Sequence, residues 1–199
     1  MGQGLWVWAV GQGLWVRGCE DGAAAIVDDQ HGHAGDGFAD ALRAAERAVA
    51  ARGELGMTFH PVKFGLFEAL EAAFVLDDKG KVRELLAIVD GLRPGQLTPL
   101  LKAQQARFRA RLAAQDEGTD VAADFATAES ILRDLDMPFR LAVTQLEHAE
   151  WLVTQGQAGE AEPLLAEARE TFERLKAAPW LERLQRVEPG RQAVLAETS

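Results

Sequence analysis

The chain has 199 residues, of which 48% are hydrophobic and 26% charged, so it can bury a substantial core in one domain or in a short array of repeats. Its formal charge of −10 opposes direct binding to nucleic acid, and no block of Lys and Arg is long enough to override that field. No apolar run approaches the roughly 20 residues of a membrane span, so no membrane contact is predicted.

The first 35 residues contain the hexapeptide Gly-Gln-Gly-Leu-Trp-Val twice, at Gly2–Val7 and at Gly11–Val16. The glycines with Leu, Trp and Val are compatible with a β-hairpin. A helical interpretation is also open, and we favour an irregular or helical segment, because one all-helical array then accounts for the whole chain. Three large apolar residues are too many for a free end, so we expect self-association into a homo-oligomer through Trp6, Trp8 and Trp15.

The same segment offers little catalytic chemistry. The two Gly-x-Gly pieces lack the third glycine of a dinucleotide fingerprint, and no phosphate-binding loop occurs, so no cofactor is predicted. His31 and His33 flank Gly32 among several aspartates, which leaves a metal-dependent enzyme as an alternative. A Gly-rich loop supplies little rigidity to a metal site, so we predict no metal and no catalytic residues. Cys19 is the only cysteine and the chain begins without a basic leader, which predicts a cytoplasmic protein.

Residues 36–188 are predicted to form an all-α domain. Segments of helical period are separated by residues that stop or cap helices, such as Asp77-Asp78-Lys79-Gly80 and Arg93-Pro94-Gly95. Thr98 is suited to cap the helix that Pro99 begins. The expected helices before the last pair are Phe38–Arg52, Pro61–Leu76, Lys81–Leu92, Thr98–Gln115 and Val121–Leu135. A short helix from Pro179 to Val187 should follow that pair, and residues 189–199 should form a frayed tail after Pro189-Gly190.

Two groups of side chains in this domain are candidates for partner binding. In the helix Pro61–Leu76, three phenylalanines fall within one arc of the helix, beside Glu71, and could line a concave surface: Phe64, Phe67 and Phe74. The open alternative is that this arc packs in the core. The densest positive cluster is Arg107, Arg109 and Arg111, where Arg107 and Arg111 could hold an acidic partner segment or form an ordinary solvated face.

The clearest pattern lies in residues 139–181, which read as two antiparallel helices joined at Gln155–Gly159. Small and large residues alternate there at positions that let paired helices approach closely: Ala149, Leu152, Gly156, Ala161, Leu165 and Ala168. Ala168 has counterparts at Ala128, Val89 and Ala48, at intervals of 40, 39 and 41 residues. His148, in the first of the two helices, is expected at the helix surface or at the edge of the core rather than as a general base.

This series resembles a tetratricopeptide unit, with Gln145 and Glu173 in place of the family's early Trp and terminal Pro. The resemblance implies antiparallel helical pairs stacked as a tetratricopeptide-like superhelix, with a period of about 40 residues. Residues 120–186 also look like the last repeats of large bacterial signalling ATPases, which are often linked to a nucleotide cyclase or a helix-turn-helix domain. That resemblance implies a non-catalytic regulatory scaffold for a protein or peptide partner. A purely structural self-assembly module is the other alternative.

Overall fold

The computed structural model describes the backbone of residues 5–9, 14–18, 24–27, 34–116 and 118–197, and the side chains of residues 37–116 and 118–187. The chain divides into two compact units, Met1–Leu97 and Thr98–Ser199. We take each unit by itself. None of the helices in the described ranges is long and apolar enough to cross a membrane.

Among its described residues, the first unit has the helices α1 (Ala34–Ala50), α2 (Arg52–Leu55), α3 (His60–Val75) and α4 (Lys79–Asp90). α1 packs on α3, and α3 packs on α4. The backbones of α1 and α3 approach closely at Gly65, where an added Cβ would lie 2.8 Å from the Cβ of Ala48. A side chain larger than hydrogen at residue 65 would therefore push the two helices apart.

The described residues of the amino-terminal segment form strands, not helices: β1 (Leu5–Ala9), β2 (Leu14–Gly18) and β3 (Ala24–Val27). They pair antiparallel in the order β1-β2-β3, with Trp8 opposite Trp15. The preference for a helical or irregular segment is therefore wrong here, and the hairpin interpretation is right. Local chemistry explains it, because aromatic and β-branched residues between glycines favour extended backbone. Trp6, Trp8 and Trp15 lie on these strands, but their side chains are outside the described residues, so self-association through them stays a prediction.

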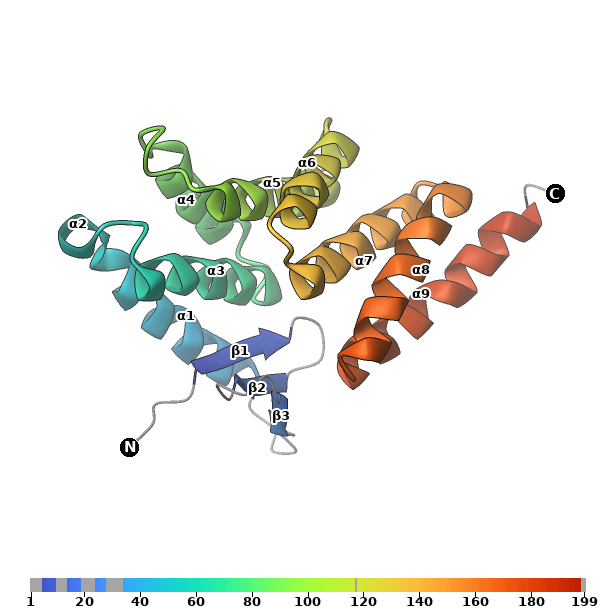
Figure 1. The fold of residues 1–199 in the computed structure, drawn as a ribbon, viewed down its shortest axis with the longest axis horizontal. Helices are drawn as coiled ribbons and strands as arrows, with labels where there is room; N and C mark the ends of the chain where they lie inside the picture. Colours follow the sequence, from blue (N-terminus) through green and yellow to red (C-terminus); the bar gives the residue numbers. More distant parts are fainter. Residues whose placement is uncertain (1–4, 10–13, 19–23, 28–33, 117, 198–199) are drawn as a thin grey trace. The chain divides into compact units, whose positions relative to one another are not determined.

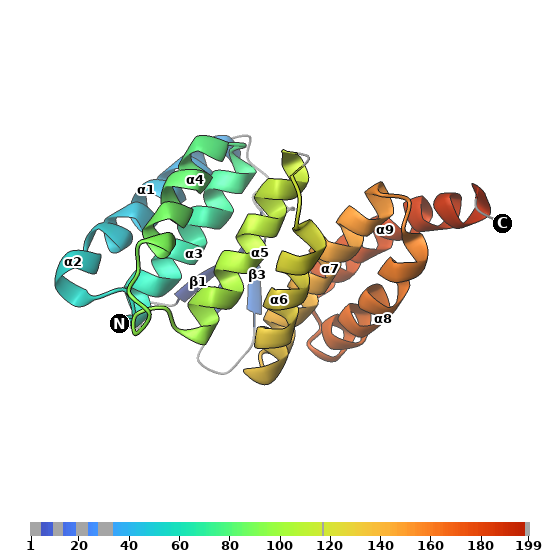
Figure 2. The same cartoon turned by 90° about the horizontal axis from the view of Figure 1, so that it is seen from above.

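The second unit consists of five helices: α5 (Pro99–Gln115), α6 (Val121–Asp134), α7 (Pro138–Thr154), α8 (Ala158–Arg174) and α9 (Ala178–Glu197). They are coloured from green to red in Figures 1 and 2. Each helix packs on the next, and α7 also contacts α5 and α9. α7 is the central element of this unit, since every residue from 141 to 149 is buried. The all-α prediction thus holds for the described elements from Ala34 onward.

The helix starts follow local signals. Thr98 caps α5 as predicted, because its hydroxyl accepts a hydrogen bond from the backbone N–H of Leu101 at 3.3 Å, and Pro99 occupies the first helical position. Pro138 likewise occupies the first position of α7, although the residue before it, Met137, makes no side-chain capping bond. The predicted helix boundaries in this unit therefore agree with the structure to within a residue or two at most starts.

The turn from α8 to α9 shows how the helices end. The backbone N–H of Lys176 donates to the carbonyl of Glu173 at 3.1 Å, and that of Ala177 donates to the carbonyl of Phe172 at 2.9 Å. This pair of bonds defines a Schellman motif, with Lys176 in the left-handed region at φ 53°. The same motif ends three other helices, α3, α6 and α7, with left-handed residues at Asp77, Asp136 and Gly156.

The carboxyl end differs from the prediction. α9 does not stop at Val187 but continues to Glu197, so the frayed tail expected for residues 189–199 is wrong for the described part of it. Pro189 therefore lies within a helix, as Pro163 does in α8. A proline inside a helix removes one backbone hydrogen bond and costs about 3 kcal/mol, which lowers stability but does not by itself end the helix.

Small residues are buried where the sequence pattern placed them. Ala128 in α6 and Ala168 in α8, which lie 40 residues apart, are both 0% exposed. Val89 in α4 is 3% exposed, whereas Ala48 in α1 is half-buried. Helix contacts made through alanine allow close approach, so the recurrence of these residues reflects packing.

Candidate interaction surface

The phenylalanine arc of α3 is mostly buried. Phe67 is 3% exposed and Phe74 is 9% exposed, and the neighbouring Glu71 is 9% exposed. Phe64 is half-buried, stacks on the ring of His60 at 4.1 Å and meets Phe67 edge-on at 5.6 Å. This burial favours the core alternative over a binding surface, because a partner needs side chains that it can reach.

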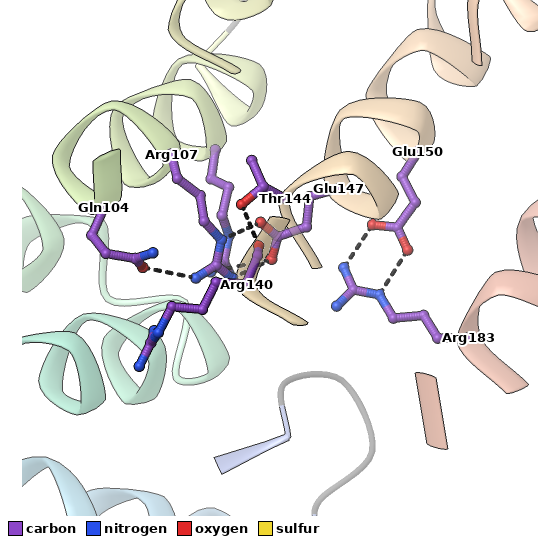
Figure 3. Close-up of polar contacts among 8 residues, drawn as sticks. Gln104, Arg107, Arg140, Thr144, Glu147, Glu150 and Arg183 are labelled. Atoms are coloured by element: carbon purple, nitrogen blue, oxygen red, sulfur yellow. Dashed lines mark hydrogen bonds and ion pairs between the residues drawn. The ribbon is translucent and has the colours of Figure 1, made fainter. Parts of the chain in front are cut away.

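The arginine cluster of α5 is split between two sides of the helix. Arg107 is 4% exposed, and its Nε and Nη2 donate to the two carboxylate oxygens of Glu147 in α7, at 2.7 and 2.6 Å (Figure 3). Arg111, one turn later, lies 3.5 Å from the same carboxylate. Arg109 is exposed on the other side. The sequence left two interpretations of this cluster, a site for an acidic partner and a solvated face. Neither fits Arg107, because it belongs to a buried ion pair between helices.

The aromatic ring of Phe108 supports both arginines. The guanidinium carbons of Arg107 and Arg111 lie 4.9 and 5.4 Å from its centroid. Nη1 of Arg107 also donates to Oε1 of Gln104 at 3.2 Å. The guanidinium groups are thus held by a ring face as well as by a carboxylate, which fixes α5 against α7.

The electrostatics of Glu147 follow from this arrangement. Burial alone would raise the pKa of its carboxyl group, but attraction to Arg107 and Arg111, the hydrogen bonds from Arg107 and the charge of Arg183 lower that pKa from 4.5 to about 2. The carboxylate is therefore charged throughout the physiological range, and it loses its favourable interactions only in acid.

A second ion pair joins α7 to α9. Arg183 donates from Nε and Nη2 to the two carboxylate oxygens of Glu150, at 2.7 and 2.6 Å (Figure 3). Its guanidinium carbon lies 5.5 Å from the ring centroid of Trp180. Burial lowers the pKa of Arg183, but its hydrogen bonds to Glu150 and the charges of Glu150 and Glu147 raise it overall. Glu147 and Glu150 thus connect α7 to α5 and to α9.

His148 belongs to the core between α6 and α7. Its Nδ1 lies 2.8 Å from a carboxylate oxygen of Glu129 in α6, and its ring stacks on Phe125 at 5.0 Å. It is 9% exposed, and its Nε2 has no hydrogen-bond partner within the protein. Of the two positions predicted for His148, the helix surface and the edge of the core, the structure has the second, on the buried side of α7 that faces α6.

The exposed cations of α5 form the remaining candidate surface. α5 carries four basic residues and no acidic one, in a chain of formal charge −10. Lys102 and Arg109 are exposed, and two helical turns separate them, so both lie on one side of the helix. Burial raises the pKa of Asp124 in the neighbouring α6, and the charge of Arg109 acts against that rise.

The residues of the enzyme alternative lie outside the described ranges. These are His31 and His33. In the part of the chain that the structure describes, no group of three or more His, Cys, Asp or Glu side chains is arranged to hold a metal ion.

Comparisons with known proteins leave the family open: no protein-family model matches the chain, and neither the curated proteins nor the solved structures give a match. The function is therefore argued from the geometry.

Sequence reasoning missed the two glutamates that organise the second unit. Glu147 and Glu150 stand in a stretch of α7 that is otherwise largely apolar, from Leu141 to Leu152. Acidic residues inside a buried helix are rare unless they are paired, and the arginines of α5 and α9 were available as partners. That signal could have predicted buried ion pairs, although not which arginine meets which glutamate.

Proposed function

We propose that this chain is a non-catalytic interaction module of stacked helical pairs, a cytoplasmic regulatory scaffold of the kind that follows the ATPase of large bacterial signalling proteins. The observation that carries the proposal is the shared Schellman turn after α6, α7 and α8. Turns of one geometry rotate each helix by a similar amount relative to the one before it. Repetition of such a step builds a tetratricopeptide-like superhelix.

Helical-pair arrays suit partner binding because their surface comes from many helices held at fixed spacing. In the second unit this rigidity has visible causes. Small residues are fully buried, at Ala128, Ala149 and Ala168, and ion pairs tie α7 to both α5 and α9. A rigid surface loses little conformational entropy when a partner binds.

The partner surface that we propose is the exposed side of α5, with Lys102 and Arg109 at its centre. Its charge is opposite to that of the chain as a whole, so it would attract an acidic segment of a protein or peptide. We propose this surface in place of the arc of Phe64, Phe67 and Phe74. We also propose that the cationic binding site is on the solvent-exposed side of α5 and does not include Arg107.

The test is capture of partners by three forms of the chain, followed by quantitative mass spectrometry. The first form is wild type, the second carries Lys102→Glu with Arg109→Glu, and the control carries Arg174→Glu with Arg186→Glu on exposed positions of α8 and α9. An acidic protein should be retained by wild type and by the control and lost from the α5 variant. Equal retention by both double variants would contradict the α5 assignment, and no specific protein in any of them would contradict the interaction function.

A further inference from the structure

α9 is held to the rest of the second unit by a compact set of contacts. The ring of Trp180 lies 5.8 Å from Phe139 in α7 and 5.7 Å from Phe172 in α8, and Trp180 is 6% exposed. Arg183 is paired with both carboxylate oxygens of Glu150. We call Phe139, Glu150 and Phe172 the α9-binding surface. It combines an apolar site for one ring with a charged site for one guanidinium, and α9 supplies both groups.

The turn that leads into α9 is strained. Its left-handed residue is Lys176, whereas the other turns with this geometry have Gly156, Asp77 or Asp136 in that place. Glycine adopts the left-handed region without cost, and the short polar side chain of aspartate tolerates it. Lysine has a Cβ and lacks a short polar group that could bond to its own backbone. The α8–α9 turn is therefore the least favourable of the four.

The sequence of this turn also favours a different conformation. Residues 175–178 are Leu, Lys, Ala and Ala, which are all strong helix formers. If the turn opened, α8 and α9 could extend toward one continuous helix, and Lys176 would leave the left-handed region.

Pro179 acts against this opening. In the closed turn it is the second residue of α9, where a backbone N–H has no partner within the helix and its loss costs nothing. In a continuous helix its ring would meet the carbonyl group of Leu175, four residues earlier. Lys176 therefore favours the open form, and Pro179 favours the closed one.

We propose that α9 exchanges between two copies of this chain, so that the α9 of each copy occupies the α9-binding surface of the other. The exchanged dimer repeats the contacts of Trp180 and Arg183 between chains and relieves Lys176 in both copies, whereas Pro179 opposes the open turn and keeps the exchange slow without warming. This inference goes beyond the interaction module proposed above, because the partner is a second copy of the chain and the surface is one that α9 fills in the monomer.

A charge exchange at the ion pair tests the proposal. One variant carries Glu150→Arg and the other carries Arg183→Glu, so each alone places like charges at the α9-binding surface. After both are warmed together to the melting midpoint and cooled, exchange would restore opposite charges at both surfaces. We expect each variant alone to melt below wild type and to stay monomeric by light scattering, and the equimolar mixture to form a 1:1 dimer with a higher melting temperature. A mixture that stays monomeric and melts like its components would overturn the proposal.

The matched control uses an ion pair that does not involve α9. Arg133 in α6 is paired with Glu167 in α8, with nitrogen and oxygen 2.9 Å apart. Arg133→Glu and Glu167→Arg, mixed in the same way, should stay monomeric. A dimer that forms equally in both mixtures would overturn the proposal, because association would then not depend on α9.

The turn itself supplies an independent test without charge changes. Pro179→Ala should raise the dimer fraction several-fold over wild type after the same warming, and Lys176→Gly should lower it. The opposite order, or no change in either variant, would show that this turn does not control exchange.

Discussion

Within the second unit, α7 is held in two different ways on its two sides. Toward α5 and α9 it uses ion pairs, the buried pair of Glu147 with Arg107 and the partly buried pair of Glu150 with Arg183. It also packs on α8, and Ala149 in α7 and Ala168 in α8 are both 0% exposed. The charged contacts depend on pairing and on pH, whereas the alanine contact depends on volume. The difference teaches that one helix can be held by opposite charges against some neighbours, here α5 and α9, and by the close packing of small side chains against another, here α8.

The largest expected effect comes from removing one partner of the buried pair. Glu147→Ala should lower the free energy of unfolding by about 3 to 5 kcal/mol, because it leaves the guanidinium of Arg107 buried without its carboxylate. Arg133→Ala, at the exposed pair with Glu167, should cost at most about 1 kcal/mol. Urea denaturation measures both. Similar losses in the two variants would mean that burial does not distinguish the two pairs.

Acid should weaken the charged side of α7 by a comparable amount. The pKa of Glu147 is lowered to about 2 in the folded protein, against 4.5 in the unfolded chain. The ionised carboxylate of Glu147 therefore stabilises the fold fully above pH 4.5, and this stabilisation is lost as pH falls toward 2. Because one pKa unit corresponds to about 1.4 kcal/mol, the total loss is about 3 kcal/mol. Unfolding free energies from pH 7 to pH 2 should fall less steeply in Glu147→Gln than in wild type, and parallel curves would contradict this.

The alanine side should respond to volume and not to pH. Ala168 in α8 is 0% exposed, so Ala168→Leu should overpack the helix contact and cost about 1 to 3 kcal/mol. Ala166, two residues earlier, is exposed, and Ala166→Leu should cost much less. Thermal melting compares the two variants directly. Equal melting temperatures would show that the close contact lies elsewhere on α8.

The smallest expected effect comes from the turns between the helices. Lys176→Gly should stabilise the protein by about 1 kcal/mol, because it removes the cost of a left-handed non-glycine residue. Asp136→Gly should gain less, since aspartate tolerates this conformation better. Chemical denaturation of both variants tests the order, and a loss of stability at Lys176→Gly would show that the flexibility of glycine in the unfolded chain outweighs the strain.

Much of the fold could be predicted from local signals. Thr98 with Pro99 marked the start of α5, and the apolar spacing of residues 139–181 predicted α7 and α8. The errors arose where two local readings competed. Consistency with the rest of the chain favours an irregular or helical amino-terminal segment, whereas the composition of the segment itself favours strands. Pro189-Gly190 predicts the end of a helix, whereas α9 continues past it to Glu197.

The candidate site was predicted less well, because its chemistry depends on contacts between helices. The spacing of Arg107 and Arg111 put both on one side of α5 and put Arg109 on another. That spacing does not say which side faces another helix. The expectation that Arg107 would bind a partner was wrong, because Glu147, 40 residues later, occupies the position opposite its guanidinium.

The sequence by itself determined where most helices begin and end, and which positions carry small residues, because caps, turns and apolar period act over a few neighbouring residues. Only the tertiary structure decided that Phe67 and Phe74 are buried, that Arg107 pairs with Glu147, and that Lys176 is held in a left-handed conformation. The physical reason is the range of the interactions. Burial, ion pairing and the strain of a turn depend on what the packing of distant helices brings together, and a local pattern carries no information about that partner.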